Sequence, residues 1–199
     1  MALPQTLQPQ QEEKKRITWE EYLQLPPSME RMEIEDGEVV LLAGSSAKHQ
    51  RVLTNLLLLL GNDPQMRGSG AILPAPFDVV ITRAPLRVRQ PDLVYIRYEK
   101  VGGSVEALDA LARLEVAPDL VVEILSPNDT IENLNAKLQD YHTLGVPEVW
   151  LVDLVPNHVF VLLREEEGWK WQEPVKGEQP LPTRQLAHSR ITPKAIFEG

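Results

Sequence analysis

The stretch from Asp119 to Leu125 has apolar side chains at both odd and even positions, which predicts a strand buried on both faces of a sheet. Glu123 is the exception within this run. Burying an unpaired carboxylate costs on the order of several kcal/mol, so a cation, a metal ion or a proton has to accompany it. The rest of the chain must therefore supply a partner for Glu123.

The residues that follow predict a helix whose buried face carries a candidate partner. Ser126 can cap the helix, Pro127 suits its first position, Asp129 completes a capping box, and Gly145 ends it. At about 100° per residue, Lys137 falls inside the apolar arc of this helix. The apolar members of the arc are Ile131, Leu134, Leu138, Tyr141 and Leu144. Lys137, a base on a buried helix face, is thus expected to face Glu123, the acid in the buried strand.

The remaining pattern predicts helices and short strands in mixed order. Expected helices cover residues 18–23 and 46–60, and a weak helix lies within 102–113; expected strands cover 39–43, 71–73, 77–82, 93–96, 148–153, 158–163 and 168–172. The remainder to residue 196 is expected to be irregular. His49, near the start of the second helix, is expected to be a surface or capping residue. Strands before and after helices in this order favour a mixed α/β (α+β) sheet flanked by helices.

Length and composition narrow the possible classes of protein. The 199 residues predict one domain over 17–199, preceded by a flexible tail over 1–16 without apolar periodicity. The chain has no cysteine, so a metal ion would have to be held by oxygen or imidazole ligands. The longest apolar run, Leu56 to Leu60, is too short to span a bilayer, and a cytoplasmic protein with no membrane partner is expected.

The charge pattern bears on nucleic-acid binding. A formal net charge of −9 opposes non-specific binding to nucleic acid by the whole molecule, but it does not exclude a local basic groove. Arg83, Arg87 and Arg89 lie within seven residues of an otherwise acidic chain. They are candidate phosphate contacts, and the alternative is solvent-facing charge on a sheet edge. Composition alone favours a solvated acidic turn for the four carboxylates of residues 33–38.

Two acids and a base form a candidate catalytic set. Asp92 opens the strand at 93–96, and Asp92, Glu123 and the carbonyl of Ile124 could hold Mg²⁺, which prefers such oxygen ligands. Lys137 could then orient water and stabilise charge on a phosphate. That set suits phosphodiester hydrolysis. Spacing alone leaves open the alternative that Glu123 and Lys137 form a buried structural salt bridge.

These motifs together resemble the Uma-two family of proteins with the restriction-endonuclease-like PD-(D/E)xK core. The motifs that carry the resemblance are Met32 to Glu38, His49-Gln50, Pro91-Asp92, Val122 to Pro127, Lys137 with Tyr141, Gly145 to Trp150, and Asp153. The resemblance implies a restriction-endonuclease-like mixed sheet core flanked by helices. It also implies Asp92 and Glu123 as metal ligands, with Glu33 as an additional acid at the site.

Two departures from the family pattern affect this interpretation. The superfamily usually places lysine two residues after the glutamate, where this chain has Leu125, so the role passes to Lys137. Relatives often carry an aspartate four residues before that lysine, where this chain has Asn133. The function implied is a Mg²⁺- or Mn²⁺-dependent endonuclease acting on DNA, with a homodimer expected because two strands need two sites. The alternative is a catalytically weak or inactive module that binds nucleic acid or protein.

Overall fold

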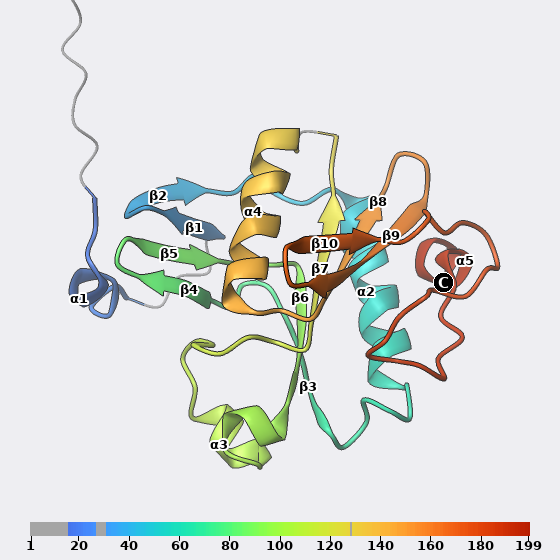
Figure 1. The fold of residues 1–199 in the computed structure, drawn as a ribbon, viewed down its shortest axis with the longest axis horizontal. Coiled ribbons are helices and arrows are strands. Elements are labelled where there is room, and N and C mark those ends of the chain that lie inside the picture. Colours follow the sequence, from blue (N-terminus) through green and yellow to red (C-terminus); the bar gives the residue numbers. More distant parts are fainter. Residues whose placement is uncertain (1–15, 27–30, 128) are drawn as a thin grey trace, which may run out of the picture.

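The computed structural model describes residues 16–26, 31–127 and 129–199 (Figure 1). Its elements are α1 (Trp19–Tyr22), β1 (Met32–Glu35), β2 (Glu38–Leu41), α2 (Ala47–Gly61), β3 (Gly70–Pro74), β4 (Val79–Arg83), β5 (Leu86–Arg89), β6 (Leu93–Arg97), a 3₁₀ turn (Tyr98–Val101), α3 (Val105–Asp109), β7 (Leu120–Leu125), α4 (Ile131–Leu144), β8 (Glu148–Asp153), β9 (His158–Glu165), β10 (Gly168–Trp171) and α5 (Pro193–Glu198). The predicted tail lies outside the described residues except for Arg16, and it stays a prediction.

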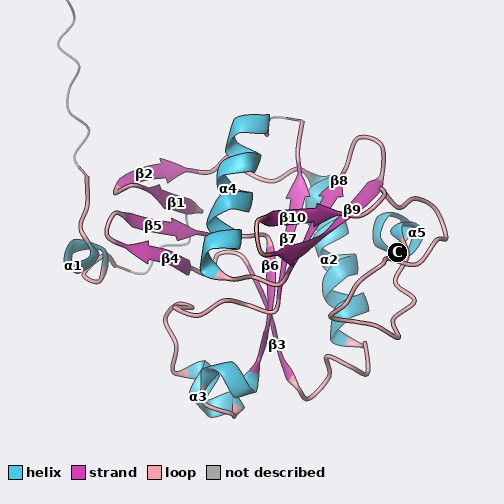
Figure 2. Cartoon of the chain, viewed as in Figure 1, coloured by secondary structure: helices cyan, strands magenta, loops and turns pink. Residues whose placement is uncertain are grey.

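The strands form two sheets, which we call sheet A and sheet B (Figure 2). Sheet A has the order β2-β1-β5-β4 and is antiparallel throughout. Sheet B has the order β10-β9-β8-β7-β6-β3, and within it β7 and β8 are parallel while the other pairs are antiparallel. The predicted mixed sheet with flanking helices is therefore confirmed.

The strand β7 lies inside sheet B and is buried on both faces, as its sequence predicts. Val122 and Ile124 belong to the core that also contains residues of α2 and α5. Val121 belongs to the opposite core with Leu138 and Tyr141 of α4. Because strand side chains alternate between faces, Glu123 points to the same side as Val121 and faces α4. The acid thus lies beneath the helix that carries Lys137.

Helix α4 lies between the two sheets in Figure 1, and it contacts β4 of sheet A and β10 of sheet B. Its predicted end is confirmed, since Gly145 caps it in the left-handed conformation at φ 93°. Its predicted start is wrong. The helix begins at Ile131 with Thr130 as its cap, and the Thr130 hydroxyl accepts from the Asn133 amide at 3.2 Å.

The residues predicted to cap α4 instead close a separate turn before it. The Asp129 carboxylate accepts a hydrogen bond from the Ser126 amide at 2.6 Å. Ile131 was expected on the buried face, but its side chain is 74% exposed because it lies in the first turn beyond the sheet. The predicted buried arc therefore holds only from Leu134 onward.

The predicted strands and the first two helices all occur, with bounds that differ by a few residues. Helix α2 is capped by Ser46 and buries Val52, Leu53, Leu56 and Leu60, as its apolar stripe predicts. Helix α5 lies in the stretch that was expected to be irregular. Its start carries a recognisable signal, because Thr192 caps it and Pro193 occupies its first position.

Candidate active site

Glu123 is 5% exposed and meets two groups from α4. The ammonium of Lys137 donates to both carboxylate oxygens, at 3.1 and 3.2 Å, and the Tyr141 hydroxyl donates to Oε1. The contact expected between Lys137 and Glu123 is therefore present. Burial raises the pKa of Glu123 to about 7; Lys137 opposes this shift, and the neighbouring charges of Asp92 and Glu33 add to it. The shift is mainly an effect of burial, and it favours the protonated form of this carboxylate.

Asp92 lies beside Glu123 because of the antiparallel pairing of β6 and β7. The register pairs Leu93 with Val122, which places the preceding Asp92 opposite Glu123. Oδ2 of Asp92 accepts from the amide of Ile124 at 2.7 Å, and it lies 3.2 Å from Nε2 of His49. Oδ1 lies 3.0 Å from Nη1 of Arg31. Burial alone would raise the pKa of Asp92, but His49, Arg31 and the Ile124 amide outweigh it and lower the pKa.

Glu33 reaches the same cluster from β1 of sheet A. Its Oε1 accepts from the Gln90 amide at 3.2 Å and lies 3.1 Å from the ammonium of Lys137, while Oε2 lies 2.8 Å from Nη1 of Arg89. Burial would raise the pKa of Glu33, yet the charges of Lys137 and Arg89 lower it. Burial works against the charge of Lys137, but Glu123 and Glu33 raise its pKa, so the ammonium stays protonated between two acids. The structure thus brings Glu33, Asp92, Glu123 and Lys137 together.

The three arginines of the basic segment occupy different environments. Arg89 has a side chain only 1% exposed, and its guanidinium contacts Glu33, Glu35 at 2.5 Å and Asp140 at 2.6 Å. A phosphate could reach this guanidinium only by breaking these ion pairs. The expectation that Arg89 contacts phosphate does not fit its burial, and we assign it to the support of Glu33.

Arg87 and Arg83 lie nearer the surface. Arg87 is 20% exposed, and its Nε and Nη2 donate to Asp140 at 2.9 and 3.0 Å. Its Nη1 donates to Asp36 at 2.8 Å. Arg83 is 62% exposed, pairs with Glu115 and lies over the ring of Trp19. Arg83 is therefore accessible to a polyanion, and Arg87 is partly accessible although Asp140 and Asp36 engage its three guanidinium nitrogens. Arg89 is inaccessible.

The family model described as "Putative restriction endonuclease", Uma2, matches residues 19–192 of the chain. The chain belongs to the Uma2 family. A solved structure titled as a putative nuclease belonging to DUF820 from Anabaena variabilis ATCC 29413 has the same fold. It has a TM-score of 0.74 and 18% sequence identity, and the match covers 92% of this chain and 98% of that chain. No curated protein matches the chain. The resemblance and the restriction-endonuclease-like fold expected from the sequence are confirmed.

The departure at Leu125 has a structural explanation in this Uma2 protein. Leu125 is partly buried among the apolar side chains that pack against α4, so a lysine there would lie in apolar surroundings. The ammonium instead arrives from the facing helix, through Lys137. In the part of the chain that is described, no helix is long and apolar enough to cross a membrane.

Three residues that contact this Uma2 site were not predicted to belong to it, namely Tyr141, His49 and Arg31. Tyr141 lies four residues after Lys137, so the two share one face of α4. His49 lies three and four residues before Val52 and Leu53, which places it on the buried stripe of α2 rather than at the surface. Arg31 directly precedes the acidic strand β1. Only tertiary contact assigns His49 and Arg31 to Asp92.

The donor set fits a hard divalent cation. Among the described residues, no three His, Cys, Asp or Glu side chains form a group that could hold a metal ion. Mg²⁺ does not require three, because it commonly takes one or two carboxylates and keeps several waters. Asp92 and Glu123 are adjacent buried carboxylates, so a cation between them would offset their mutual repulsion. Asp92, Glu123 and the carbonyl of Ile124 would hold the ion.

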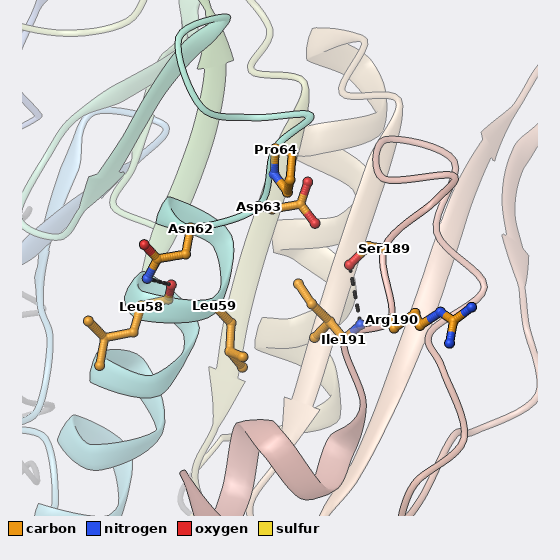
Figure 3. Close-up of a pocket in the computed structure, with 8 residues that line it drawn as sticks. All are labelled: Leu58, Leu59, Asn62, Asp63, Pro64, Ser189, Arg190 and Ile191. Carbon is orange, nitrogen blue, oxygen red and sulfur yellow. Dashed lines mark hydrogen bonds between the residues drawn. The ribbon is translucent and has the colours of Figure 1, made fainter.

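A surface pocket of about 400 Å³ lies elsewhere, between the end of α2 and the segment 189–191 (Figure 3). Its polar groups are engaged locally, since Asn62 donates to the Leu58 carbonyl at 2.8 Å and the Ser189 hydroxyl accepts from the Ile191 amide at 3.2 Å. His49 and Asn62 lie at opposite ends of α2, about 20 Å apart along its axis at 1.5 Å per residue. The pocket is therefore separate from the acidic cluster.

Proposed function

We propose that this protein is a divalent-metal-dependent endonuclease that hydrolyses DNA phosphodiester bonds. The observation that carries the proposal is the adjacency of Asp92 and Glu123 on β6 and β7, with the ammonium of Lys137 held against Glu123 at 3.1 Å. Membership of a family whose description is "Putative restriction endonuclease" supports the reaction class. Accessible Arg83 and Arg87 support a polyanionic substrate in a chain whose net charge is otherwise −9.

The roles of the residues follow from their contacts. Asp92, Glu123 and the carbonyl of Ile124 bind Mg²⁺ or Mn²⁺, and the bound ion supplies Lewis acidity that acidifies water and neutralises phosphate charge. Lys137 positions water and stabilises the charge that develops on the phosphate. Glu33 pairs with the Lys137 ammonium, and the Tyr141 hydroxyl donates to the Glu123 carboxylate. These two residues therefore keep the ammonium and the carboxylate in position. We also propose that two copies act on a duplex, one for each strand.

The test is cleavage of supercoiled plasmid DNA by purified protein with Mg²⁺, Mn²⁺ or a chelator. We expect nicked and linear products only with the metal ions, and no products with Asp92→Asn. DNA binding without cleavage under every metal condition would replace the proposal with the alternative of a binding module on the same fold.

Metal binding should stabilise the wild-type protein and should depend on pH. The pKa of folded Glu123 is raised to about 7, above its ordinary 4.5, so its contribution to metal-free stability falls as the pH rises from about 4.5 to about 7. The ionised form is the one that binds a cation. We therefore expect millimolar Mg²⁺ to raise Tm more at pH 8 than at pH 6, as measured by thermal melts.

Asp92→Asn is the matched control for this metal response, because it removes one charged ligand and changes little volume. We expect its Tm to be insensitive to Mg²⁺ at either pH. A wild-type Tm that does not respond to Mg²⁺, or an equal response in Asp92→Asn, would count against a metal site at these residues.

Phosphate binding by Arg83 and Arg87 predicts a change in salt dependence. Replacing either residue by alanine should weaken DNA binding about equally for all sequences, and it should lower the slope of log K against log salt by about one unit. Fluorescence anisotropy with a short duplex at several salt concentrations measures both quantities. Arg164→Ala, a change on β9, is the control, and a slope that matches the wild type in the Arg83 and Arg87 variants would place the phosphate contacts elsewhere.

A further inference from the structure

Arg31 contacts Asp92, the proposed metal ligand, and its contacts allow the guanidinium to move from Asp92 to another anion. Its Nη1 lies 3.0 Å from Oδ1 of Asp92, and its Nη2 donates to the carbonyl of Gln90 at 3.0 Å. Its Nε is buried without a hydrogen-bond partner among the described residues. The Arg31 side chain is 22% exposed, while that of Asp92 is 5% exposed. The Arg31 side chain therefore covers one side of a buried acid and is itself partly exposed.

A structural arginine on β6 makes a contrast with this arrangement. Arg97, at the far end of β6, holds buried Asp119 through its amide at 2.9 Å and through Nη1 at 2.7 Å, and its Nη2 donates to Gln185 at 3.0 Å. Asp119 has a second cation, Lys100, at 3.0 Å. Arg97 is 35% exposed, and its partner Asp119 lies beside the other end of β6 from Asp92. Arg31 differs in that its acid is the proposed metal ligand. Its unpartnered Nε alone does not set it apart, because Nη2 of the supporting Arg89 also lacks a partner among the described residues.

Arg31 and a divalent cation compete for Asp92. A metal ion bound to a carboxylate oxygen lies about 2.1 Å from it. Since Nη1 of Arg31 lies 3.0 Å from Oδ1, an ion on that oxygen would lie at most about 5 Å from the guanidinium nitrogen. Two cations this close repel strongly at a site with little water. Metal binding at Asp92 is therefore opposed by Arg31 as long as the ion pair persists.

We propose that Arg31 neutralises Asp92 in the metal-free protein and transfers its guanidinium to a substrate phosphate when a divalent cation occupies Asp92. The guanidinium fork matches two phosphate oxygens, and the unused Nε would then gain an acceptor. Arg31 adjoins the proposed metal ligand and is partly exposed, whereas Arg89 is 1% exposed and held by three acids. The inference rests on the proposed metal-dependent nuclease function.

The first arm of the test measures Mn²⁺ affinity by calorimetry, without DNA. Because the competing cation is lost, Arg31→Met should bind Mn²⁺ about 3- to 10-fold more tightly than the wild type, and Arg31→Gln, which keeps a donor for the Gln90 carbonyl, should do the same. Arg97→Met is the matched control, since it breaks an arginine–aspartate pair away from the site, and its Mn²⁺ affinity should be unchanged.

The second arm measures binding of a short DNA duplex with and without Ca²⁺, with the DNA checked for integrity on a gel. With Ca²⁺, both Arg31 variants should bind DNA about tenfold more weakly and show a salt slope lower by about one unit. Without metal the loss should be several-fold smaller, because wild-type Arg31 is then held by Asp92. A purely structural Arg31 would lower metal and DNA affinity together.

The outcomes separate the two proposals. If wild-type protein and Asp92→Asn bind Mn²⁺ equally, or neither binds it, the proposed function fails at its metal site. If the wild type binds Mn²⁺ through Asp92 but neither Arg31 variant binds it more tightly, the exchange is overturned while the nuclease proposal stands. An unchanged DNA affinity in the presence of Ca²⁺ overturns the phosphate contact.

Discussion

Lys137→Met should abolish most DNA cleavage. It should also lower the free energy of unfolding, and bound metal ions should recover much of that loss. The ammonium of Lys137 lies between the carboxylates of Glu123 and Glu33, at 3.1 Å from each. Without metal, its loss leaves two buried acids short of a cation, which should cost roughly 3–5 kcal/mol of unfolding free energy. Mg²⁺ at Glu123 should recover much of this. Cleavage should still fall by on the order of 10²-fold or more, because methionine cannot stabilise the developing charge.

The measurement pairs thermal melts with cleavage rates on one preparation of Lys137→Met, with and without Mg²⁺. Lys100→Met is the control, because Lys100 also contacts a buried carboxylate, Asp119, but lies outside the site. It should lose stability without a metal-dependent recovery, and the folded protein should cut at the wild-type rate. A stable, metal-binding Lys137→Met protein with wild-type cleavage would remove Lys137 from the mechanism.

Arg89→Met should be the most destabilising single arginine replacement in the basic segment. Its guanidinium contacts three carboxylates, from Glu33, Glu35 and Asp140, of which Glu33 and Asp140 are buried from water. These two acids keep Lys137 and Arg87 as partners but lose one buried cation between them, which should cost roughly 3–5 kcal/mol. For a domain of this size that corresponds to a fall in Tm of roughly 6–20 °C. Thermal and urea unfolding of the purified variant measure the change.

Arg87→Met is the matched comparison, since Arg87 shares the Asp140 carboxylate but is 20% exposed. We expect it to cost about 1–2 kcal/mol, because Arg89 still pairs with Asp140 and water can solvate Asp36. Adding Asp140→Asn to Arg89→Met should recover part of the lost stability, since it removes a buried charge that has lost one of its two cations. Equal effects of the Arg87 and Arg89 replacements would contradict the supporting role assigned to Arg89.

The sequence predicted the centre of the site because both of its features are local. The apolar run around Glu123 marks a buried acid, and the 3.6-residue period places Lys137 on the buried face of the next helix. The start of α4 was mispredicted for a local reason as well. Ser126 and Thr130 are both good caps, and only the geometry at the end of β7 decides that Thr130 begins the helix.

The supporting groups could not be predicted because their environments come from distant segments. Arg89 alternates with apolar residues as a solvent-facing strand residue would, and its burial results from acids on β1 and α4. His49 contacts Asp92 although it lies more than 40 residues before it in the chain, on α2. Pattern reasoning identifies which side chains are out of place, but the contacts that satisfy them depend on tertiary packing.

The delivery of the ammonium by a helix restricts the length of the connection between β7 and α4. A lysine two residues beyond the acid on the same strand would keep its place whatever turn followed. Lys137 instead depends on how many residues separate Leu125 from Ile131. One residue inserted or deleted there has to be absorbed within the turn, or Lys137 rotates by about 100° around the helix axis and leaves Glu123. Functional relatives that use this helix-borne lysine should therefore tolerate substitutions in this turn far better than changes in its length.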